Sequence, residues 1–267
     1  MYETTYLRAA SLDEAVGWLR EHEEARPLSG GMTLIPTLKQ RLAAPSHLID
    51  LTRIDALRGI EVCGSVLRIG ALSKHAEVAA SSVVRGAIPA LASLAGVIAD
   101  PQVRNRGTLG GSVANNDPAA DYPAAVLGLN AHVVTSSQRR IPADEFFVDT
   151  FETALRPDEL VTAIEFAIPL RAAYAKYRHP ASGYAVAGVF IAQYDDTIRV
   201  AVTGAGASVF RWFDAENALQ QDLSHAALAS LCIDRDTLPD DDNASAPYRA
   251  HLIETYTRRA LQALLAS

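Results

Sequence analysis

Apolar positions in the first half of the chain recur with two different spacings, which predict alternating helices and strands. After Ser11 they recur every three or four residues over 12–22, as in an amphipathic helix. Ser11 and Glu14 have the spacing of a capping box, so we expect this helix to begin at Ser11. Shorter apolar runs at 47–54 and 65–72 predict strands.

An alanine-rich apolar stretch follows at 74–99 and predicts more helix. We expect two pieces, separated before Pro89, because the residue that precedes a proline disfavours the helical conformation. The segment 124–136 runs from a helical pattern into a strand pattern. The first 170 or so residues therefore alternate strands and helices.

The pattern changes near Pro169. Residues 173–212 predict two or three strands with an Asp-Asp turn at 195–196, and helices are expected over 225–233 and 246–266. Strands followed by helices are typical of an α+β domain. We therefore expect an α+β protein with a first domain over 1–170 and a C-terminal α+β domain over 171–267, built on an antiparallel sheet.

Composition narrows the possible functions. The chain has 267 residues, of which 49% are hydrophobic and 21% charged, as in globular proteins. A net charge of −7 argues against a nucleic-acid partner. No apolar run approaches the length of a transmembrane helix, and the N-terminus does not resemble a signal peptide, so we expect a cytoplasmic protein with no transmembrane segment.

Cys63 and Cys232 are the two cysteines of the chain, and they lie far apart in the sequence. Without a C-x-x-C spacing they do not suit an iron–sulfur cluster or a zinc site. A disulfide between them has no support, and we expect two buried free thiols. The scattered histidines His75, His179 and His225 are expected to be structural or exposed.

Two glycine pairs are the candidate binding elements. The first, LSGGMTLIP at 28–36, follows a short predicted strand. Glycine permits positive φ and leaves backbone N–H groups accessible to an anion, and Thr33 adds a hydroxyl donor. This chemistry suits a phosphate or pyrophosphate. An ordinary strand–turn–helix connection remains the alternative for this element alone.

The second element, TLGGSVANNDPAADYP at 108–123, repeats this logic. Its Gly-Gly step would supply further N–H and hydroxyl donors. Asp117 and Asp121 could accept hydrogen bonds from the hydroxyls of a ribose or ribityl chain, although an aspartate capping the following helix is the alternative. A dinucleotide with a diphosphate and two polyol segments requires this combination of donors and acceptors.

The two elements together resemble the paired FAD-binding motifs of the flavoprotein subunits of molybdenum hydroxylases. That family comprises the medium subunit of carbon monoxide dehydrogenase-type enzymes and the FAD domain of xanthine dehydrogenase. Residues 28–36 are similar to its Ala-Gly-Gly-x-Asp/Ser-Leu-Leu/Ile-Pro loop, and 108–121 to its Thr-Ile/Leu-Gly-Gly-Asn/Ser loop with the downstream aspartates. The segments 158–169 and 173–189 also resemble family segments, so the resemblance extends over nearly the whole chain.

The resemblance implies a fold and a set of FAD contacts. The fold is a two-subdomain FAD-binding domain of the PCMH/vanillyl-alcohol-oxidase type, with subdomains at about 1–56 and 57–170, followed by a C-terminal domain of the carbon monoxide dehydrogenase flavoprotein type. The first loop would wrap the FAD pyrophosphate with Pro27, Leu28, Ser29, Gly30, Gly31, Met32, Thr33 and Leu34. A second cradle would consist of Thr108, Leu109, Gly110, Gly111 and Ser112.

Further contacts follow from the same resemblance. Asp121 would bind the ribityl or adenosine hydroxyls, and Leu160 or Val161 would pack near the flavin. Lys176 would reach the polar edge of the flavin, where a cation stabilises the negative charge of the reduced ring; a solvated lysine at the start of a strand is the alternative. The sequence departs from many relatives at 183–184, where Gly-Tyr replaces a common aspartate.

The resemblance also implies an electron-transfer function with no catalytic acid or base and no metal on this chain. Electrons would arrive from [2Fe–2S] clusters of a small partner subunit, while a large partner holds molybdopterin and oxidises the substrate. The assembly would be a dimer of heterotrimers. A stand-alone FAD-dependent oxidase or reductase of the same fold is the alternative. A degenerate assembly protein without FAD is disfavoured because both glycine pairs are intact.

Overall fold

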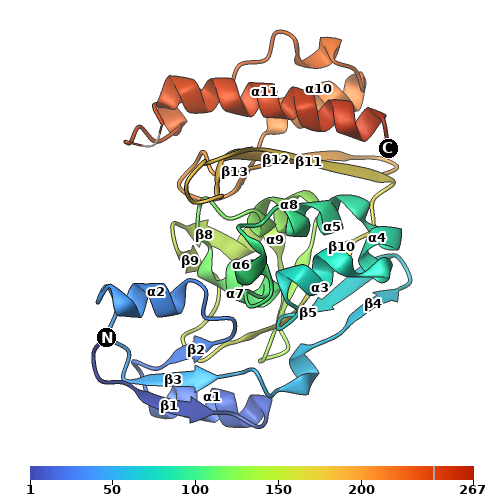
Figure 1. Cartoon of the computed structure of the whole chain (residues 1–267). Helices are drawn as coiled ribbons and strands as arrows, with labels where there is room; N and C mark the ends of the chain where they lie inside the picture. Colours follow the sequence, from blue (N-terminus) through green and yellow to red (C-terminus); the bar gives the residue numbers. More distant parts are fainter. Residues whose placement is uncertain (243) are drawn as a thin grey trace.

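The computed structural model describes residues 1–242 and 244–267, which form stacked layers (Figure 1). The first layer is a parallel sheet in the order β1-β3-β2, made of β1 (Thr5–Arg8), β3 (His47–Asp50) and β2 (Arg26–Leu28). Helix α1 (Leu12–Glu21) packs on it. The predicted start of α1 is confirmed, because the Ser11 side chain accepts a hydrogen bond from the Glu14 N–H.

The second layer is an antiparallel sheet in the order β4-β5-β10-β6-β7. Strand β10 (Val161–Ala167) lies between β5 and β6, although it follows β6 by a long stretch of sequence. The other strands are β4 (Ile60–Cys63), β5 (Val66–Gly70), β6 (His132–Thr135) and β7 (Arg140–Pro142). A hairpin of β8 (Phe147–Asp149) and β9 (Glu152–Thr153) follows β7.

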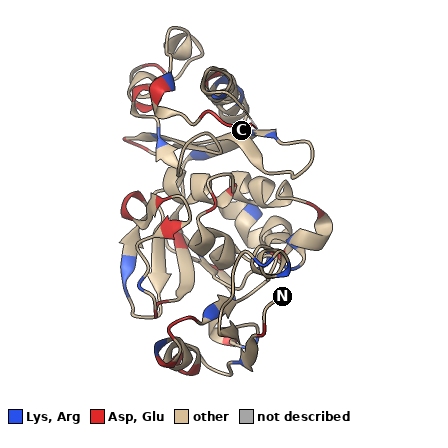
Figure 2. Cartoon of the chain, turned by 90° about the vertical axis from the view of Figure 1, so that its left-hand side faces the viewer, with Lys and Arg blue, Asp and Glu red and all other residues tan. Residues whose placement is uncertain are grey.

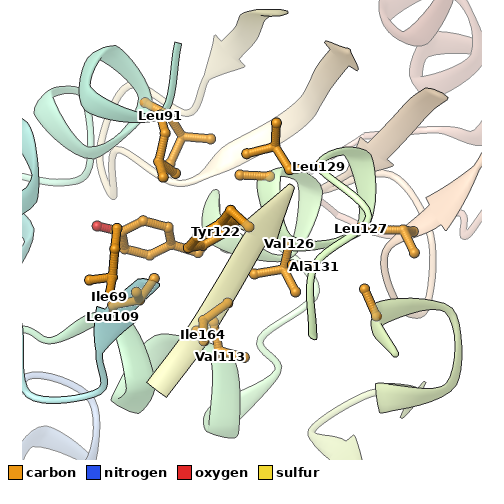
Figure 3. Packing of buried hydrophobic residues seen from close by; sticks show 14 of the residues in the cluster. Ile69, Leu91, Leu109, Val113, Tyr122, Val126, Leu127, Leu129, Ala131 and Ile164 are labelled. Carbon is orange, nitrogen blue, oxygen red and sulfur yellow. The ribbon is translucent and has the colours of Figure 1, made fainter. Parts of the chain in front are cut away.

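Seven helices belong to this layer. They are α3 (His75–Ala80), α4 (Ser82–Ala87), α5 (Pro89–Gly96), α6 (Pro101–Arg104), α7 (Leu109–Asn115), α8 (Tyr122–Gly128) and α9 (Ala143–Phe146). Their buried side chains pack against β5, β6 and β10, as Figure 3 shows for Leu91 of α5 and Tyr122 of α8 in the same core as Ile164 of β10. This core fixes the start of α7 and of α8, which both border the candidate site.

The expectation of two helical pieces over 74–99 is wrong, because the structure has three helices there. The additional break falls at Ser81, whose backbone is extended and whose hydroxyl accepts a hydrogen bond from the Val84 N–H. A serine that caps a new helix competes with continuation of the preceding one.

The C-terminal layer is an antiparallel sheet in the order β11-β12-β13-β14, and α10 and α11 cover its outer face (Figure 1). Alternate residues of β12 point to opposite faces, so Val189 and Ile191 join the α11 core while Phe190 and Ala192 pack toward α8. The elements are β11 (Arg171–Arg178), β12 (Ala185–Gln193), β13 (Ile198–Thr203), β14 (Phe210–Arg211), α10 (Phe213–Gln221) and α11 (Ala246–Leu265).

Two C-terminal expectations need correction. The helix expected over 225–233 is a short 3-10 turn at Ala226–Leu228, and Leu228 and Ile233 are the buried residues of that stretch. With so little apolar surface to bury, packing does not stabilise a longer helix there. Helix α10 was not predicted from the pattern of apolar positions. Cys63 and Cys232 are free, as expected, but they are exposed instead of buried.

Charged residues of both signs are interspersed along the described chain (Figure 2). No helix of the described residues combines the length and the apolar character that a membrane crossing requires.

Candidate functional site

An open cavity of about 270 Å³ lies where the three layers meet. Every residue from Pro27 to Leu34 lines it, which includes most of the first glycine element. Thr108, Gly111, Ser112, Asp117 and Asp121 line it as well. The structure thus brings both glycine elements and both aspartates of the sequence analysis to one site.

The first glycine element presents free backbone donors to this cavity. Within residues 1–242 and 244–267, no protein atom accepts a hydrogen bond from the N–H groups of Gly30, Gly31 or Met32. Gly31 has φ of 70°, which a side chain would disfavour. A Cβ at Gly30 would collide with the backbone of Arg106 and Gly107. Glycine therefore serves both the turn and the close approach of the second element.

The second element uses its N–H groups for folding, which contradicts the expectation of a second set of free donors. Leu109 N–H donates to Ser73 O (2.9 Å) and Gly110 N–H to Ala71 O (2.9 Å). The Gly111 N–H donates to the Thr108 hydroxyl (3.2 Å), because Thr108 caps the N-terminus of α7.

Direct contact joins the two elements. The Thr108 hydroxyl donates to the Ser29 hydroxyl at 3.1 Å. A Cβ at Gly111 would lie 2.8 Å from Ser29 Oγ and 2.9 Å from Thr108 Oγ1, so the contact requires glycine at this position. The two glycine pairs therefore form one continuous wall of the cavity.

The segment 117–121 of the second element is held by the C-terminal sheet. Thr203 at the end of β13 donates its hydroxyl to Pro118 O (3.0 Å) and Ala120 O (2.7 Å). The N–H groups of Gly204 and Ala185 donate to Pro118 O (2.7 Å) and Ala119 O (3.1 Å). The cavity wall that contains both aspartates therefore depends on the C-terminal sheet.

Asp117 and Asp121 differ in their partners. The Asp117 carboxylate accepts one local bond, from the Ala119 N–H at 2.9 Å, and burial raises its pKa. Asp121 is almost fully buried and accepts from the Tyr174 hydroxyl (2.5 Å) and from the Lys176 ammonium (2.8 Å). Burial raises the pKa of Asp121. Lys176 and Tyr174 partly offset this rise, because both stabilise the carboxylate and so lower the pKa.

These contacts decide two alternatives from the sequence, a helix-capping aspartate and a solvated lysine. Asp121 precedes α8, but its side chain makes no capping hydrogen bond to this helix. Asp117 accepts a hydrogen bond from the backbone two residues further on. The side chain of Lys176 is only 6% exposed, so the alternative of a solvated lysine is wrong.

Five of the expected contact residues do not line the cavity: Leu109, Gly110, Leu160, Val161 and Lys176. Leu109, Leu160 and Val161 are buried in the hydrophobic cores. A Cβ at Gly110 would overlap Ala71, so this glycine allows α7 to pack close to the end of β5. The ammonium of Lys176 bonds instead to two groups of the cavity wall, Asp121 and the carbonyl of Gly183 (3.0 Å).

Several lining residues give no sign of their role in the sequence. His75, expected to be structural or exposed, borders the cavity as a buried residue, and its Nδ1 atom has no partner among the described residues. Burial and the charge of Arg104 lower its pKa to about 4, so the imidazole is neutral at pH 7. Isolated histidines give no sequence signal, because only the fold brings His75 beside Gly107.

Tyr184 and Ala99 are two further lining residues. Tyr184 and Thr33 line the same cavity, so the 179–184 turn between β11 and β12 and the first glycine element border it together. Ala99 has φ of 42°, and Arg104 and Arg178 both donate to its carbonyl (3.0 and 3.1 Å). In the sequence, the departure from the family pattern at 183–184 was the one sign that this part of the cavity lining is unusual.

The described lining contains no lysine or arginine. An anion in the cavity would be bound by neutral donors, namely the N–H groups of Gly30, Gly31 and Met32 and nearby hydroxyls, as in glycine-rich phosphate loops. Asp117 supplies an acceptor for hydroxyl groups. These residues fit a dinucleotide that combines a pyrophosphate with polyols, and FAD is such a molecule.

Comparison with known proteins identifies the family. The model of the FAD binding domain in molybdopterin dehydrogenase matches residues 2–170. The chain is 34% identical to the carbon monoxide dehydrogenase medium chain of Hydrogenophaga pseudoflava, over 97% of this chain and 96% of the relative. It is 32% identical to the glyceraldehyde dehydrogenase medium chain of Sulfolobus acidocaldarius, over 97% of this chain and 98% of the relative.

Solved structures of related enzymes contain chains that resemble this chain over nearly its full length. A chain in the structure of carbon monoxide dehydrogenase from Hydrogenophaga pseudoflava superposes with a TM-score of 0.90 at 34% identity, covering 99% of this chain and 98% of that one. A chain in quinoline 2-oxidoreductase from Pseudomonas putida 86 gives a TM-score of 0.89 at 26% identity, covering 99% and 97%. The protein therefore belongs to the FAD-binding medium subunits of the molybdopterin dehydrogenases and is a subunit of an oxidoreductase.

Proposed function

We propose that this chain is the electron-transfer subunit of a heterotrimeric molybdenum hydroxylase. It holds FAD between the [2Fe–2S] clusters of a small partner subunit and an external electron acceptor, and a large partner subunit holds molybdopterin and oxidises the substrate. Two such heterotrimers would associate as a dimer. The observation that carries the proposal is the cavity wall formed by the two glycine elements, in a chain that aligns end to end with medium chains of dehydrogenases.

Within this proposal the chain binds and orients the cofactor. The N–H groups of Gly30, Gly31 and Met32 would hold the pyrophosphate, and the Asp117 carboxylate would accept from polyol hydroxyls. Bound FAD supplies one- and two-electron redox chemistry. Asp121 would contribute through its position in the wall, because Tyr174 and Lys176 already donate to its oxygens.

No acid–base step is required of the chain. His75 is neutral at pH 7 because its pKa is lowered to about 4, and the raised pKa values of Asp117 and Asp121 have burial as their main cause. The protein's contribution is therefore a pre-formed, charge-neutral set of donors that holds a redox cofactor in place. The organic substrate is selected on the large partner.

The FAD site is tested by Gly111→Val. The new side chain would enter the contact between Ser29 and Thr108 and separate the two glycine elements. Overpacking costs about 1–3 kcal/mol, and 1.4 kcal/mol is tenfold in affinity, so FAD binding should weaken roughly ten- to a hundredfold. Fluorescence titration of FAD on the purified chain measures this change.

Gly86→Val in α4 is the matched control, because a Cβ at Gly86 meets nothing within 4 Å. It should bind FAD as the wild type does. Wild-type affinity in Gly111→Val would show that the joined glycine elements do not form the FAD site.

A further inference from the structure

Two segments of the cavity wall are tied to the same side chain. The segment 117–121 lines the cavity with Asp117 and Asp121, and the 179–184 turn lines it with Gly183 and Tyr184. They lie far apart in the sequence, one before α8 and the other between β11 and β12. Lys176 in β11 contacts both of them.

The ammonium of Lys176 is committed to these two segments. It lies 2.8 Å from Asp121 Oδ1 and 2.9 Å from Asp121 Oδ2, and it donates to Gly183 O at 3.0 Å. The Lys176 and Asp121 side chains are only 6% and 3% exposed. An ammonium has three N–H donors, so these acceptors occupy most of its hydrogen-bonding capacity. Lys176 itself does not line the cavity.

The turn that Lys176 holds needs an external support. Gly183 has φ of 76°, and the turn closes with two local backbone bonds, from Gly183 N–H to His179 O (2.9 Å) and from His179 N–H to Tyr184 O (2.8 Å). Two longer bonds to side chains, from Ser182 N–H to His179 Nδ1 (3.3 Å) and from Tyr184 N–H to the Ser182 hydroxyl (3.4 Å), add to them. Residues of the turn are mostly exposed, so few buried contacts fix it. The bond from Lys176 to the Gly183 carbonyl anchors the turn to buried Asp121, and the turn places Tyr184 in the cavity wall that also contains Thr33.

We propose that Lys176 is a positioning residue of the FAD cavity, which acts by fastening the 179–184 turn to Asp121 and not by contact with the flavin. Only the FAD measurements that test this inference rest on the proposed function. It makes the C-terminal sheet part of the FAD site, although the family match covers residues 2–170.

The test compares Lys176→Met with Tyr174→Phe in the full chain. Lys176→Met keeps the aliphatic stem but loses the tie to Gly183, whereas Tyr174→Phe removes another donor to Asp121 and leaves that tie intact. Amide hydrogen exchange without FAD should rise by about tenfold or more at Gly183 and Ala185 in Lys176→Met. In Tyr174→Phe it should stay near the wild-type rate.

FAD measurements separate positioning from flavin contact. Lys176→Met should bind FAD about tenfold more weakly and, once saturated with FAD, keep the wild-type flavin midpoint potential. A shifted potential with wild-type exchange in the turn would show a direct flavin contact and overturn the proposal. Wild-type exchange together with wild-type FAD affinity would overturn it as well.

A second variant covers the case in which Lys176→Met does not fold. Asp121→Asn combined with Lys176→Met removes both buried charges, and fast exchange at Gly183 in this variant supports the proposal while wild-type protection contradicts it. Exchange is measured without cofactor. Absence of FAD binding by the wild type would therefore refute the proposed function and leave the exchange result interpretable.

Discussion

His75 occupies the first position of α3, with its imidazole packed between Gly107 and the ring of Tyr122. Because the buried ring lies near Arg104, the proton binds it less readily in the folded chain than in the unfolded one, and its pKa falls from 6.5 to about 4. Between these two values the unfolded state binds more protons, so stability decreases as the pH falls.

The lowered pKa of His75 predicts how the variant His75→Gln should respond to pH. From pH 7 to pH 5 the wild type should lose about 2 kcal/mol of unfolding free energy through His75 alone. The variant should lack this contribution, and His225→Gln at an exposed position should retain it. Urea unfolding at the two pH values measures the difference. Equal pH dependence in wild type and His75→Gln would contradict the account of a buried neutral imidazole.

Single residues of the site were predictable where the local backbone conformation or a close approach requires a particular residue type. Glycines at 30, 31 and 111 are required by a positive φ or by a close approach, and the sequence displays those requirements directly. His75 and Tyr184 were not predictable, because only long-range packing brings them to the cavity. The N–H groups of Leu109 and Gly110 were misjudged because their acceptors, Ser73 and Ala71, lie more than thirty residues earlier in the chain.

At the scale of elements, α8 couples the cavity to the C-terminal sheet. It begins beside Asp121 and ends at Gly128, where a Cβ would lie 2.9 Å from Phe190 Cδ1 and 3.5 Å from the Ala201 Cβ. Glycine thus lets the helix approach β12 and β13 closely. Phe190 is fully buried, so its ring has little space to move away.

Two glycine substitutions should therefore have opposite effects on stability. Gly128→Ala should destabilise the chain by about 1–3 kcal/mol through overpacking against Phe190. Gly17→Ala in α1 meets nothing within 4 Å and should stabilise the chain by about 0.5–1 kcal/mol, because alanine favours a helix over glycine. The denaturant midpoints of the two variants, compared with that of the wild type, measure these changes in stability. A stabilising Gly128→Ala would disprove the close packing of α8 on the sheet.

Elements were predictable where apolar spacing and a cap agree, as at Ser11 for α1. Pattern alone could not place β10 between β5 and β6, because that pairing is set by the fold of the whole layer. A single capping serine at position 81 was enough to divide an apolar stretch differently from the expectation. Local signals, caps included, therefore determine the elements, and tertiary packing determines their partners.

At the scale of the whole molecule, three layers each contribute a wall to one cavity. The first layer provides the loop with free N–H donors, the second provides the start of α7, and the C-terminal sheet holds 117–121 and provides the 179–184 turn. Such a cavity positions a cofactor without a lysine or arginine side chain in its described lining. Substrate chemistry is then left to partner subunits, as the proposed function requires.

The most direct measurement of this account is affinity purification of the chain from its native host, followed by absorption spectroscopy and metal analysis. We predict recovery with two partner subunits, with molybdenum and iron in the complex and one FAD for each copy of this chain. A yellow chain recovered alone would contradict the heterotrimer and favour a stand-alone flavoenzyme. A colourless chain recovered alone would contradict the proposed FAD site itself.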